Sequence, residues 1–503
     1  MKERDREPNE HESTDVNLLQ GKSVSRREFL KIAGIAGATV GVGAGLGGLV
    51  AACGGTTTTT AAPATTATTS APSSTETTAA ASTTTVSATA EVGRTIKLGC
   101  VSPLTGAASA FGIPDKWIRD QWLAVAGDGM VFGDNKKHPI TIEMSDSQSD
   151  TNRAAQVAGD LIQNSKIDIM MVSSSPDTVN PVADQCEAQS TPCLSTDCPM
   201  EPYFFGRGKK SPTESYKWNY LVFWGNYELM SAAKVVLAQV PTNKVVGGVW
   251  SNEVDGEARR SDLTPFFKDN GYKLIDGGAY QVGTEDYTSM IAKFKTAGVQ
   301  IVSFLGIPPD LANFWKQSLQ QGFHPVIADM AKATLFPSAM EALGTTGFGM
   351  IAWSWWHPTL PWKSSLTGED CATMATRFEK DTNNQWTQPL MHYVTFEWVV
   401  DVLKRVTNPD DKEEIMKAVA STKMADSMAG AFDFTSPVAP NSRHIVPNVY
   451  GTQAFYGQWL KATKQYPWDI KQWMYDLVVI DNTMCPDIAV QAPLKAIDYS
   501  AMA

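Results

Sequence analysis

The feature that most constrains the fold is an alternation of strand and helix that occurs twice along the chain. The first run predicts strands at 95–101, 140–144 and 167–172 and helices at 114–126 and 151–164. The second run predicts strands at 244–250, 272–280 and 300–304 and helices at 256–270, 284–297 and 310–321. Strands and helices that alternate at this spacing form βαβ units around a parallel sheet. We therefore predict an α/β fold with two doubly wound, mostly parallel sheets, each flanked by helices and each forming one lobe.

The position of a ligand site follows from this architecture. In doubly wound sheets, ligands bind beyond the carboxyl ends of the strands. When two such lobes face each other, these two edges enclose a cleft. We expect the functional residues to lie in the loops that follow the strands and to come from both lobes.

The N-terminus carries an export signal followed by a lipidation site. Arg26 and Arg27 precede a weakly apolar segment at 32–52, and the small residues before Cys53 resemble a lipobox. We predict that residues 1–52 are a twin-arginine lipoprotein signal peptide and that Cys53 is lipidated. The protein would then sit on the extracytoplasmic face of the membrane, in the periplasm or at the cell surface. The alternative is a membrane span, because 21 residues suffice to cross a bilayer.

The next segment, residues 53–92, is rich in Thr, Ala and Ser. It lacks the large apolar side chains that offset chain entropy, so we predict a disordered linker. The full chain has a net charge of −11. This acidic balance argues against nucleic acid as a partner and against a basic surface that docks on membranes.

The sequence contains none of the common catalytic motifs. No HExxH, GxSxG or Walker A pattern occurs, and the six histidines show no metal-ligand spacing. His392 is predicted to belong to the helix over 395–406. We therefore expect a protein that is not an enzyme and needs no cofactor or metal, although a triad of distant residues remains an alternative.

Six cysteines follow Cys53. In an exported protein they suggest disulfides, and Cys186 with Cys193 is the preferred pair because a helix end and the next strand bring them close. Buried free thiols and a metal site are the alternatives.

Three segments in order carry a family resemblance: IKLGCVSPLTGAASAFG, MMVSSSPDTVNPVADQC and TPCLSTDCP. Over about 95–459 the chain resembles the branched-chain amino acid, amide and urea branch of type I solute-binding proteins, the extracytoplasmic receptors of ABC importers. The resemblance implies a periplasmic-binding-protein fold that closes on a small solute about hinges near Trp224, Trp353 and Phe455. It implies a first lobe of residues 95–223 and 354–455, and a second of 224–353 and 456–503. It also implies a monomer that delivers the solute to ABC permease subunits.

The resemblance also implies a set of ligand-binding residues in the cleft loops. They are Phe111, Ser173, Ser174, Ser175, Thr196, Asp197, Asp255, Ile307, Asp329 and Lys332. Serine hydroxyls and free amides at a helix N-terminus can bind a carboxylate, and Asp197 or Asp255 can bind an ammonium group. The alternative for the three serines is a turn that caps the following helix. If Lys332 faces the cleft, a carboxylate without an α-ammonium group becomes the better ligand; Asp329 either binds the ammonium group or lies in a solvated loop.

Four tryptophans between 353 and 362 leave two alternatives. They stack on an aromatic ligand or enclose a cation, or they pack at the hinge, which the family position favours. The sequence does not identify the solute: amino acids, amides, urea and aromatic carboxylates all fit. A ligand-sensing lipoprotein that feeds a signalling receptor and an adhesive lipoprotein are the alternative functions. No role is assigned to residues after about 465.

Overall fold

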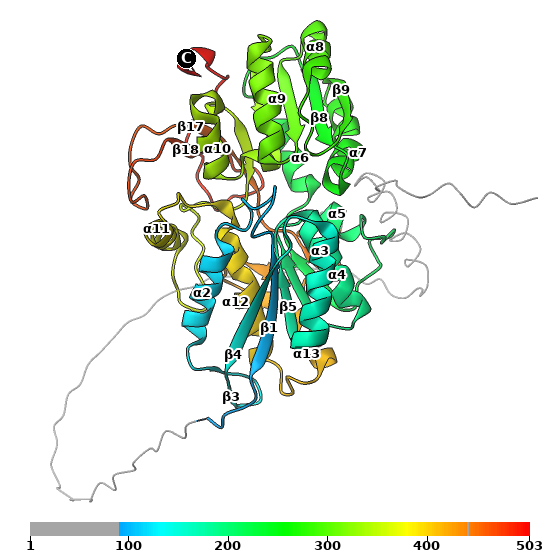
Figure 1. Cartoon of the computed structure of the whole chain (residues 1–503), viewed down its shortest axis with the longest axis vertical. Helices are drawn as coiled ribbons and strands as arrows, with labels where there is room; N and C mark the ends of the chain where they lie inside the picture. The colour runs from blue at the N-terminus through cyan, green and yellow to red at the C-terminus, as the bar shows by residue number, and fades with distance from the viewer. Residues whose placement is uncertain (1–89, 440–441, 503) are drawn as a thin grey trace, which may run out of the picture.

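The computed structural model describes residues 90–439 and 442–502. The signal and lipidation residues Arg26, Arg27 and Cys53 lie outside the described residues, and so does nearly all of the predicted linker. The described chain forms two lobes that are stacked along the long axis of the molecule (Figure 1). Each lobe is built on its own seven-stranded sheet.

The lower lobe in Figure 1 contains the first sheet. Its strands, in spatial order, are β15 (His444–Val446), β16 (Val449–Tyr450), β7 (Asn219–Val222), β6 (Cys193–Thr196), β5 (Ile169–Val172), β1 (Ile96–Ser102) and β4 (Ile140–Asp146). All neighbours run parallel except β15 and β16. The four residues of β5 and the four of β6 are all buried. Such fully buried strands are typical of parallel sheets covered by helices on both faces.

Helices cover this first sheet. They are α2 (Asp115–Ala126), α3 (Thr151–Asp160), α4 (Ser175–Ala188), α5 (Met200–Phe204), α11 (Cys371–Thr382), α12 (Val394–Lys404) and α13 (Lys412–Ala420). Several begin at an aspartate whose side chain accepts a backbone N–H of the first turn, as Asp150 does from Arg153 at α3. Such caps satisfy donors that have no partner within the helix.

The upper lobe contains the second sheet. Its strands, in spatial order, are β18 (Tyr475–Asp481), β17 (Phe455–Lys461), β12 (Ile351–Ser354), β11 (Ile327–Asp329), β10 (Ile301–Leu305), β8 (Val245–Ser251) and β9 (Lys273–Tyr280). The five strands from β12 to β9 run parallel to one another. Strand β17 runs antiparallel to both of its neighbours, β12 and β18. The helices of this lobe are α6 (Asn226–Val236), α7 (Val254–Asp269), α8 (Thr288–Ala297), α9 (Pro308–Gln320) and α10 (Pro337–Leu343). The predicted fold class, two mostly parallel sheets flanked by helices, is confirmed.

Some predicted boundaries differ from those observed. The helix predicted over 151–164 ends at Asp160 and continues as a π-turn, Leu161–Ser165. The helix predicted from 284 begins at Thr288, because the preceding loop is fixed by contacts to α9: the Tyr287 amide donates to the Gln317 side chain. Short two-stranded ribbons, β2 (Met130–Val131) with β3 (Lys137–His138) and β13 (Lys423–Met424) with β14 (Phe432–Asp433), were not predicted.

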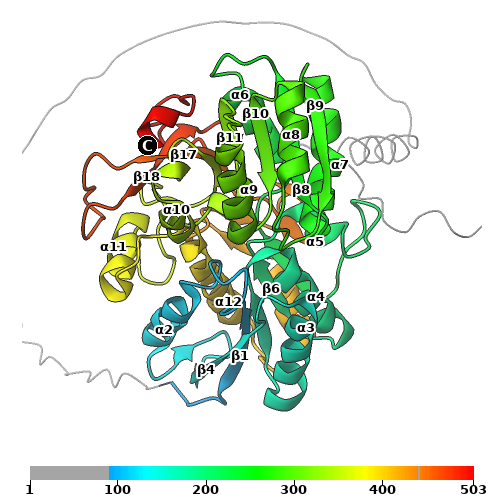
Figure 2. The same cartoon turned by 45° about the horizontal axis from the view of Figure 1, so that its top comes forward.

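The C-terminal region connects the lobes at a second place besides the chain crossings. The hairpin of β17 and β18 extends the upper sheet, and Figure 2 shows α11 just below it. The loop at 462–474 binds α11: Glu379 accepts hydrogen bonds from the Ile470 amide (3.0 Å) and the Trp473 indole (2.9 Å). Since α11 packs on α2, where the Phe378 and Trp117 rings lie 5.5 Å apart, this loop ties the upper sheet to the lower lobe.

Other sequence expectations concern thiols, metals and membrane spans. All six cysteines in the described ranges are buried free thiols, so the predicted disulfide between Cys186 and Cys193 is not formed; the two thiols lie against each other, and Cys193 also contacts the Ser195 hydroxyl. Within 90–439 and 442–502, no group of three or more His, Cys, Asp or Glu side chains is arranged so that it could hold a metal ion. None of the described helices is long and apolar enough to span a bilayer.

Candidate ligand-binding site

A cavity lies where the two lobes meet, at the carboxyl ends of strands from both sheets. In this closed arrangement its volume is about 20 Å³. Its lining residues are Phe111, Ser175, Pro176, Asp197, Pro199, Phe223, Trp224, Asp255, Lys332, Leu335, Trp353 and Trp355. Phe111 of the lower lobe meets Phe336 of the upper lobe edge to face, with ring centroids 4.7 Å apart. The lobes therefore touch at the mouth of the cavity.

The backbone is strained at the strand ends beside this cavity. Ser174 and Ser175 after β5, Asp197 after β6 and Ala331 after β11 all have positive φ, between 44° and 85°. Non-glycine residues rarely adopt this conformation, and such strain clusters at ligand sites. The Ser175 amide donates to the Asp197 carbonyl (2.8 Å), which holds the two loops together. Contacts between the loops therefore hold the strained backbone in its conformation.

One charge cluster at the cavity lies entirely within the lower lobe, and we call it the His392 cluster. His392 occupies a 3₁₀ turn, Gln388–Tyr393, just before α12, and not the helix to which the sequence assigned it. Its Nδ1 lies 2.8 Å from Asp115 and its Nε2 lies 2.9 Å from Asp197. Burial alone would lower the pKa of His392, but these carboxylates outweigh it and raise the pKa to about 9. The imidazole is therefore a buried cation at neutral pH.

A second charge cluster, the Lys332 cluster, is formed mainly by the upper lobe. Lys332 follows β11, and its ammonium group lies 2.7 Å from Glu253 and 3.0 Å from Asp255, at the start of α7. Gly256 lets α7 approach β8, because a Cβ there would overlap the Ser251 carbonyl. Burial opposes the charge of Lys332, but both acids raise its pKa. The pKa of Glu253 is lowered because Lys332 outweighs burial, whereas burial raises that of Asp255.

The lower lobe adds one more carboxylate to this cluster, Asp177. It lies in the first turn of α4, and it interacts with Glu253, Asp255 and Lys332 across the lobe boundary. Burial, followed by repulsion from Glu253, raises the pKa of Asp177 to about 6. Three carboxylates thus share one ammonium group, and the Lys332 cluster carries excess negative charge.

Aromatic rings form the wall on the hinge side of the cavity. Trp224 lies where the chain first crosses between lobes, and Trp353 and Trp355 lie where it crosses again after β12. The Trp355 ring centroid is 5.0 Å from that of Phe223 and 5.7 Å from that of Trp224. The Arg259 guanidinium stacks 3.5 Å from the Trp353 ring centroid. Trp353 and Trp355 pack at the hinge, as the family position favours, and they also line the cavity; stacking on a ligand stays a prediction.

Several polar groups at the site already have partners, and a few do not. The Thr196 hydroxyl donates to the Val222 carbonyl (2.8 Å), and the Ser173 hydroxyl lies 3.1 Å from His392 Nδ1. By contrast, the indole N–H groups of Trp224 and Trp355 are buried without a hydrogen-bond partner among the described residues. The Ser174 hydroxyl is also buried and unpartnered in that part of the chain. An unpaired buried donor costs free energy unless a ligand or water accepts from it.

The structure brings together some, but not all, of the residues predicted for the site. Phe111, Ser175, Asp197, Asp255 and Lys332 line the cavity. Ser173, Ser174 and Thr196 lie on the same strand ends, with the partners just described.

Two further predicted residues are absent from the cavity lining. Ile307 caps α9, and Asp329 is buried beneath the site, where the Tyr456 hydroxyl lies 3.5 Å away. The alternative of a solvated Asp329 is wrong, because the residue ends β11 and is buried.

Sequence reasoning missed His392, Glu253 and Asp177. Asp177 lies in the quoted SSSPD segment, two residues after the last serine, so the helix start that it occupies was visible. Glu253 stands two residues before Asp255, in the same loop. His392 left no local signal, since its partners are 277 and 195 residues away in the sequence.

The family comparison matches most of the folded region. A family model described as "Periplasmic binding protein" matches residues 95–457. The match ends early in β17, so most of the C-terminal hairpin lies outside it.

Individual relatives are distant. A leucine-, isoleucine-, valine-, threonine- and alanine-binding protein of Pseudomonas aeruginosa is 24% identical over 233 residues, which cover 45% of this chain and 58% of the relative. A periplasmic binding protein from Burkholderia mallei has a similar structure, with a TM-score of 0.61 and 15% identity over 79% of this chain and 97% of that one. A solute-binding protein of an ABC transporter from Rhodopseudomonas palustris, in complex with 3,4-dihydroxybenzoic acid, has a TM-score of 0.59 and 14% identity over 78% of this chain and 99% of that one.

Proposed function

Because this chain belongs to the periplasmic binding protein family, a family of binding proteins and not of enzymes, we propose that it is the substrate-binding protein of an ABC importer. It captures a small polar solute, such as an amino acid or an amide, and delivers it to permease subunits. A distant relative that binds five amino acids supports this substrate range. A neighbour in complex with an aromatic carboxylate makes that class the second candidate.

One observation carries the proposal: the cavity is lined from both lobes at the carboxyl ends of both sheets. A ligand there touches both halves, so binding favours the closed arrangement over the open one. The hinges are the chain crossings near Trp224, Trp353 and Phe455. The lobes are residues 95–223 with 354–455, and 224–353 with 456–503. The permease then recognises the closed form of a monomer.

We further propose that the protein acts outside the cytoplasm, exported by the twin-arginine route and anchored through Cys53. The support is the N-terminal sequence, together with the family, whose members meet their solutes outside the cytoplasm. Replacing Cys53 by serine should release the protein from the membrane fraction into the soluble fraction of the native host. Replacing Arg26 and Arg27 by lysines should retain the precursor in the cytoplasm. Membrane retention of the serine variant would contradict the lipid anchor.

The binding function is tested by thermal unfolding of the protein without residues 1–53, in the presence of amino acids, amides, amines and aromatic carboxylates. A ligand at 100 times its Kd adds about 2.7 kcal/mol to the free energy of unfolding, which raises Tm measurably. A clear hit identifies the solute class. The absence of any shift across the whole panel would contradict the receptor function.

A further inference from the structure

We infer that the cavity selects a small organic cation: a protonated amine on an apolar or aromatic body that also carries a neutral hydrogen-bond acceptor. This inference rests on the proposed receptor function and names the charge class of its solute. It excludes carboxylates that lack an ammonium group.

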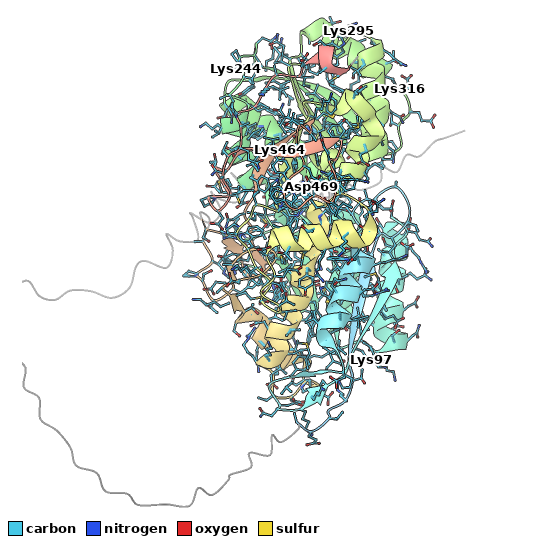
Figure 3. All side chains as sticks on the ribbon, turned by 90° about the vertical axis from the view of Figure 1, so that its left-hand side faces the viewer. Lys97, Lys244, Lys295, Lys316, Lys464 and Asp469 are labelled. Atoms are coloured by element: carbon cyan, nitrogen blue, oxygen red, sulfur yellow. The ribbon has the colours of Figure 1, made fainter. Side chains whose placement is uncertain are left out.

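The first argument is the charge at the cavity. Asp177, Glu253 and Asp255 face a single ammonium group, that of Lys332. Lys332 is the only basic residue among those that line the cavity. Figure 3 shows Lys97, Lys244, Lys295 and Lys316 on the outer parts of the two lobes. Of the three acids, Asp255 lines the cavity and the other two lie behind it, so the cluster, with more carboxylates than cations, attracts an entering ammonium group and repels an entering carboxylate.

The second argument is that the protein's own groups occupy the place where an anion would bind. The N-terminus of α4 already holds the Asp177 carboxylate in its first turn, and the Ser175 amide donates to the Asp197 carbonyl. The Thr196 hydroxyl donates to the Val222 carbonyl, and the His392 imidazole lies between Asp115 and Asp197. The donors that have no partner among the described residues, the Ser174 hydroxyl and the Trp224 and Trp355 indoles, are neutral and offer a carboxylate no opposite charge.

The third argument is the aromatic wall. Tryptophan faces attract cations within about 6 Å of the ring centroid. Arg259 already occupies the Trp353 ring, which leaves Trp224 and Trp355 for a ligand. Their buried, unpartnered indole N–H groups need an acceptor. A carbonyl or hydroxyl oxygen on the ligand supplies one without the negative charge that the acidic cluster repels.

The test compares ligands of the same shape that differ in charge. L-Phenylalaninamide, L-phenylalanine, 3-phenylpropanamide and 3-phenylpropionate carry a cation, both charges, no charge and an anion on one skeleton. L-Leucinamide, L-leucine, 4-methylpentanamide and 4-methylpentanoate repeat the series on an aliphatic body. By calorimetry at pH 7.5, we expect at least one of the two cationic amides to bind at least tenfold more tightly than the matching carboxylate.

A pair of variants locates the effect. Asp177→Asn should weaken binding of the cationic amide at least tenfold, because the uncompensated carboxylate is gone. Glu143→Gln removes the same charge from an exposed position on β4 of the same lobe and should change the affinity less than twofold.

The inference is overturned if a carboxylate binds as tightly as its cationic partner, if Asp177→Asn leaves cation binding unchanged, or if neither amide binds while the broad panel yields another ligand. In each case a solute still binds and the receptor function stands. A lack of binding by every solute in both panels would instead overturn the receptor function itself.

Discussion

The His392 and Lys332 clusters lie on opposite sides of one cavity and bury their charged groups in different ways. The His392 cluster joins α2, the loop after β6 and the turn before α12, which all belong to the lower lobe. One cation lies between two carboxylates, and each ring nitrogen has a partner. The Lys332 cluster spans both lobes and has one carboxylate more, Asp177. In the His392 cluster each carboxylate contacts the cation directly, whereas the Lys332 cluster includes one carboxylate, Asp177, without a cation of its own.

This difference separates a structural role from a binding role. Taking a charge out of water is unfavourable unless partners replace the lost hydration, so a cluster that stays buried must be fully paired. In the proposed closure mechanism, the Lys332 cluster becomes accessible when the lobes separate, because Asp177 then moves away from Glu253 and Asp255. Its excess negative charge is therefore exposed to water in the open form and can attract a ligand cation.

The largest effect should come from the fully paired cluster. His392→Gln removes the cation between two buried aspartates and should lower the free energy of unfolding by about 3–5 kcal/mol, since a buried charge loses its partner. Chemical denaturation measures this change. His324→Gln, at an exposed ring stacked on Tyr499, is the control and should cost less than about 0.5 kcal/mol.

The pH dependence of stability supplies an independent readout for His392. Its pKa is raised to about 9 in the folded protein, from a usual value near 6.5. The stabilisation is complete below pH 6.5 and is lost as the pH rises through 9. The glutamine variant should lose this decline. An identical decline in both proteins would show that His392 is not a buried cation.

The sequence was sufficient to predict the two sheets, because the strands of a parallel sheet are short apolar runs with helices between them. The family resemblance placed Asp255 and Lys332 near the cleft, in loops that follow strands. It could not give their pairing. Whether Lys332 binds a ligand carboxylate or the protein's own acids depends on distances between loops about 80 residues apart.

The residues that sequence reasoning missed share a cause. In the sequence, His392 lies just before an apolar helix and looks like part of it. In the structure this helix begins at Val394, and contacts with distant residues place the imidazole between two aspartates. Residues after about 465 were likewise unassigned, because the contacts of their loop with Glu379 join positions more than 90 residues apart in the sequence.

The next prediction addresses the incompletely paired cluster. Binding of a cation should weaken about tenfold as the pH falls from 7 to 5, because protonation of Asp177, whose pKa is about 6, removes the attracting charge. Burial raises the pKa of Asp177 most; Glu253 and Asp255 raise it further, and Lys332 lowers it. Calorimetry at several pH values measures the trend, and Asp177→Asn should flatten it. A pH-independent affinity in the native protein would assign cation binding to another group.

A smaller effect should follow from a change in the aromatic wall. Trp355→Phe keeps a ring at the hinge but removes an indole N–H that has no partner among the described residues. If that group donates to the ligand, affinity should fall about fivefold, which corresponds to roughly 1 kcal/mol for one hydrogen bond. Trp356→Phe is the matched control, since that ring packs against Trp386 and does not line the cavity. Equal affinities of the two variants would contradict a donated hydrogen bond from Trp355.

The smallest change in stability should come from Lys332, although its ammonium group is as buried as the imidazole of His392. Lys332→Met leaves Glu253, Asp255 and Asp177 without a cation, but separation of the lobes returns these carboxylates to water. The substitution therefore removes only the free energy that favours the closed form. The free energy of unfolding should change by less than about 1 kcal/mol. Small-angle scattering should show a more open ligand-free molecule, while Lys316→Met, on the outside of α9, should leave it unchanged. A loss of stability as large as that of His392→Gln would mean that the Lys332 cluster never opens, and the contrast between the two clusters would then fail.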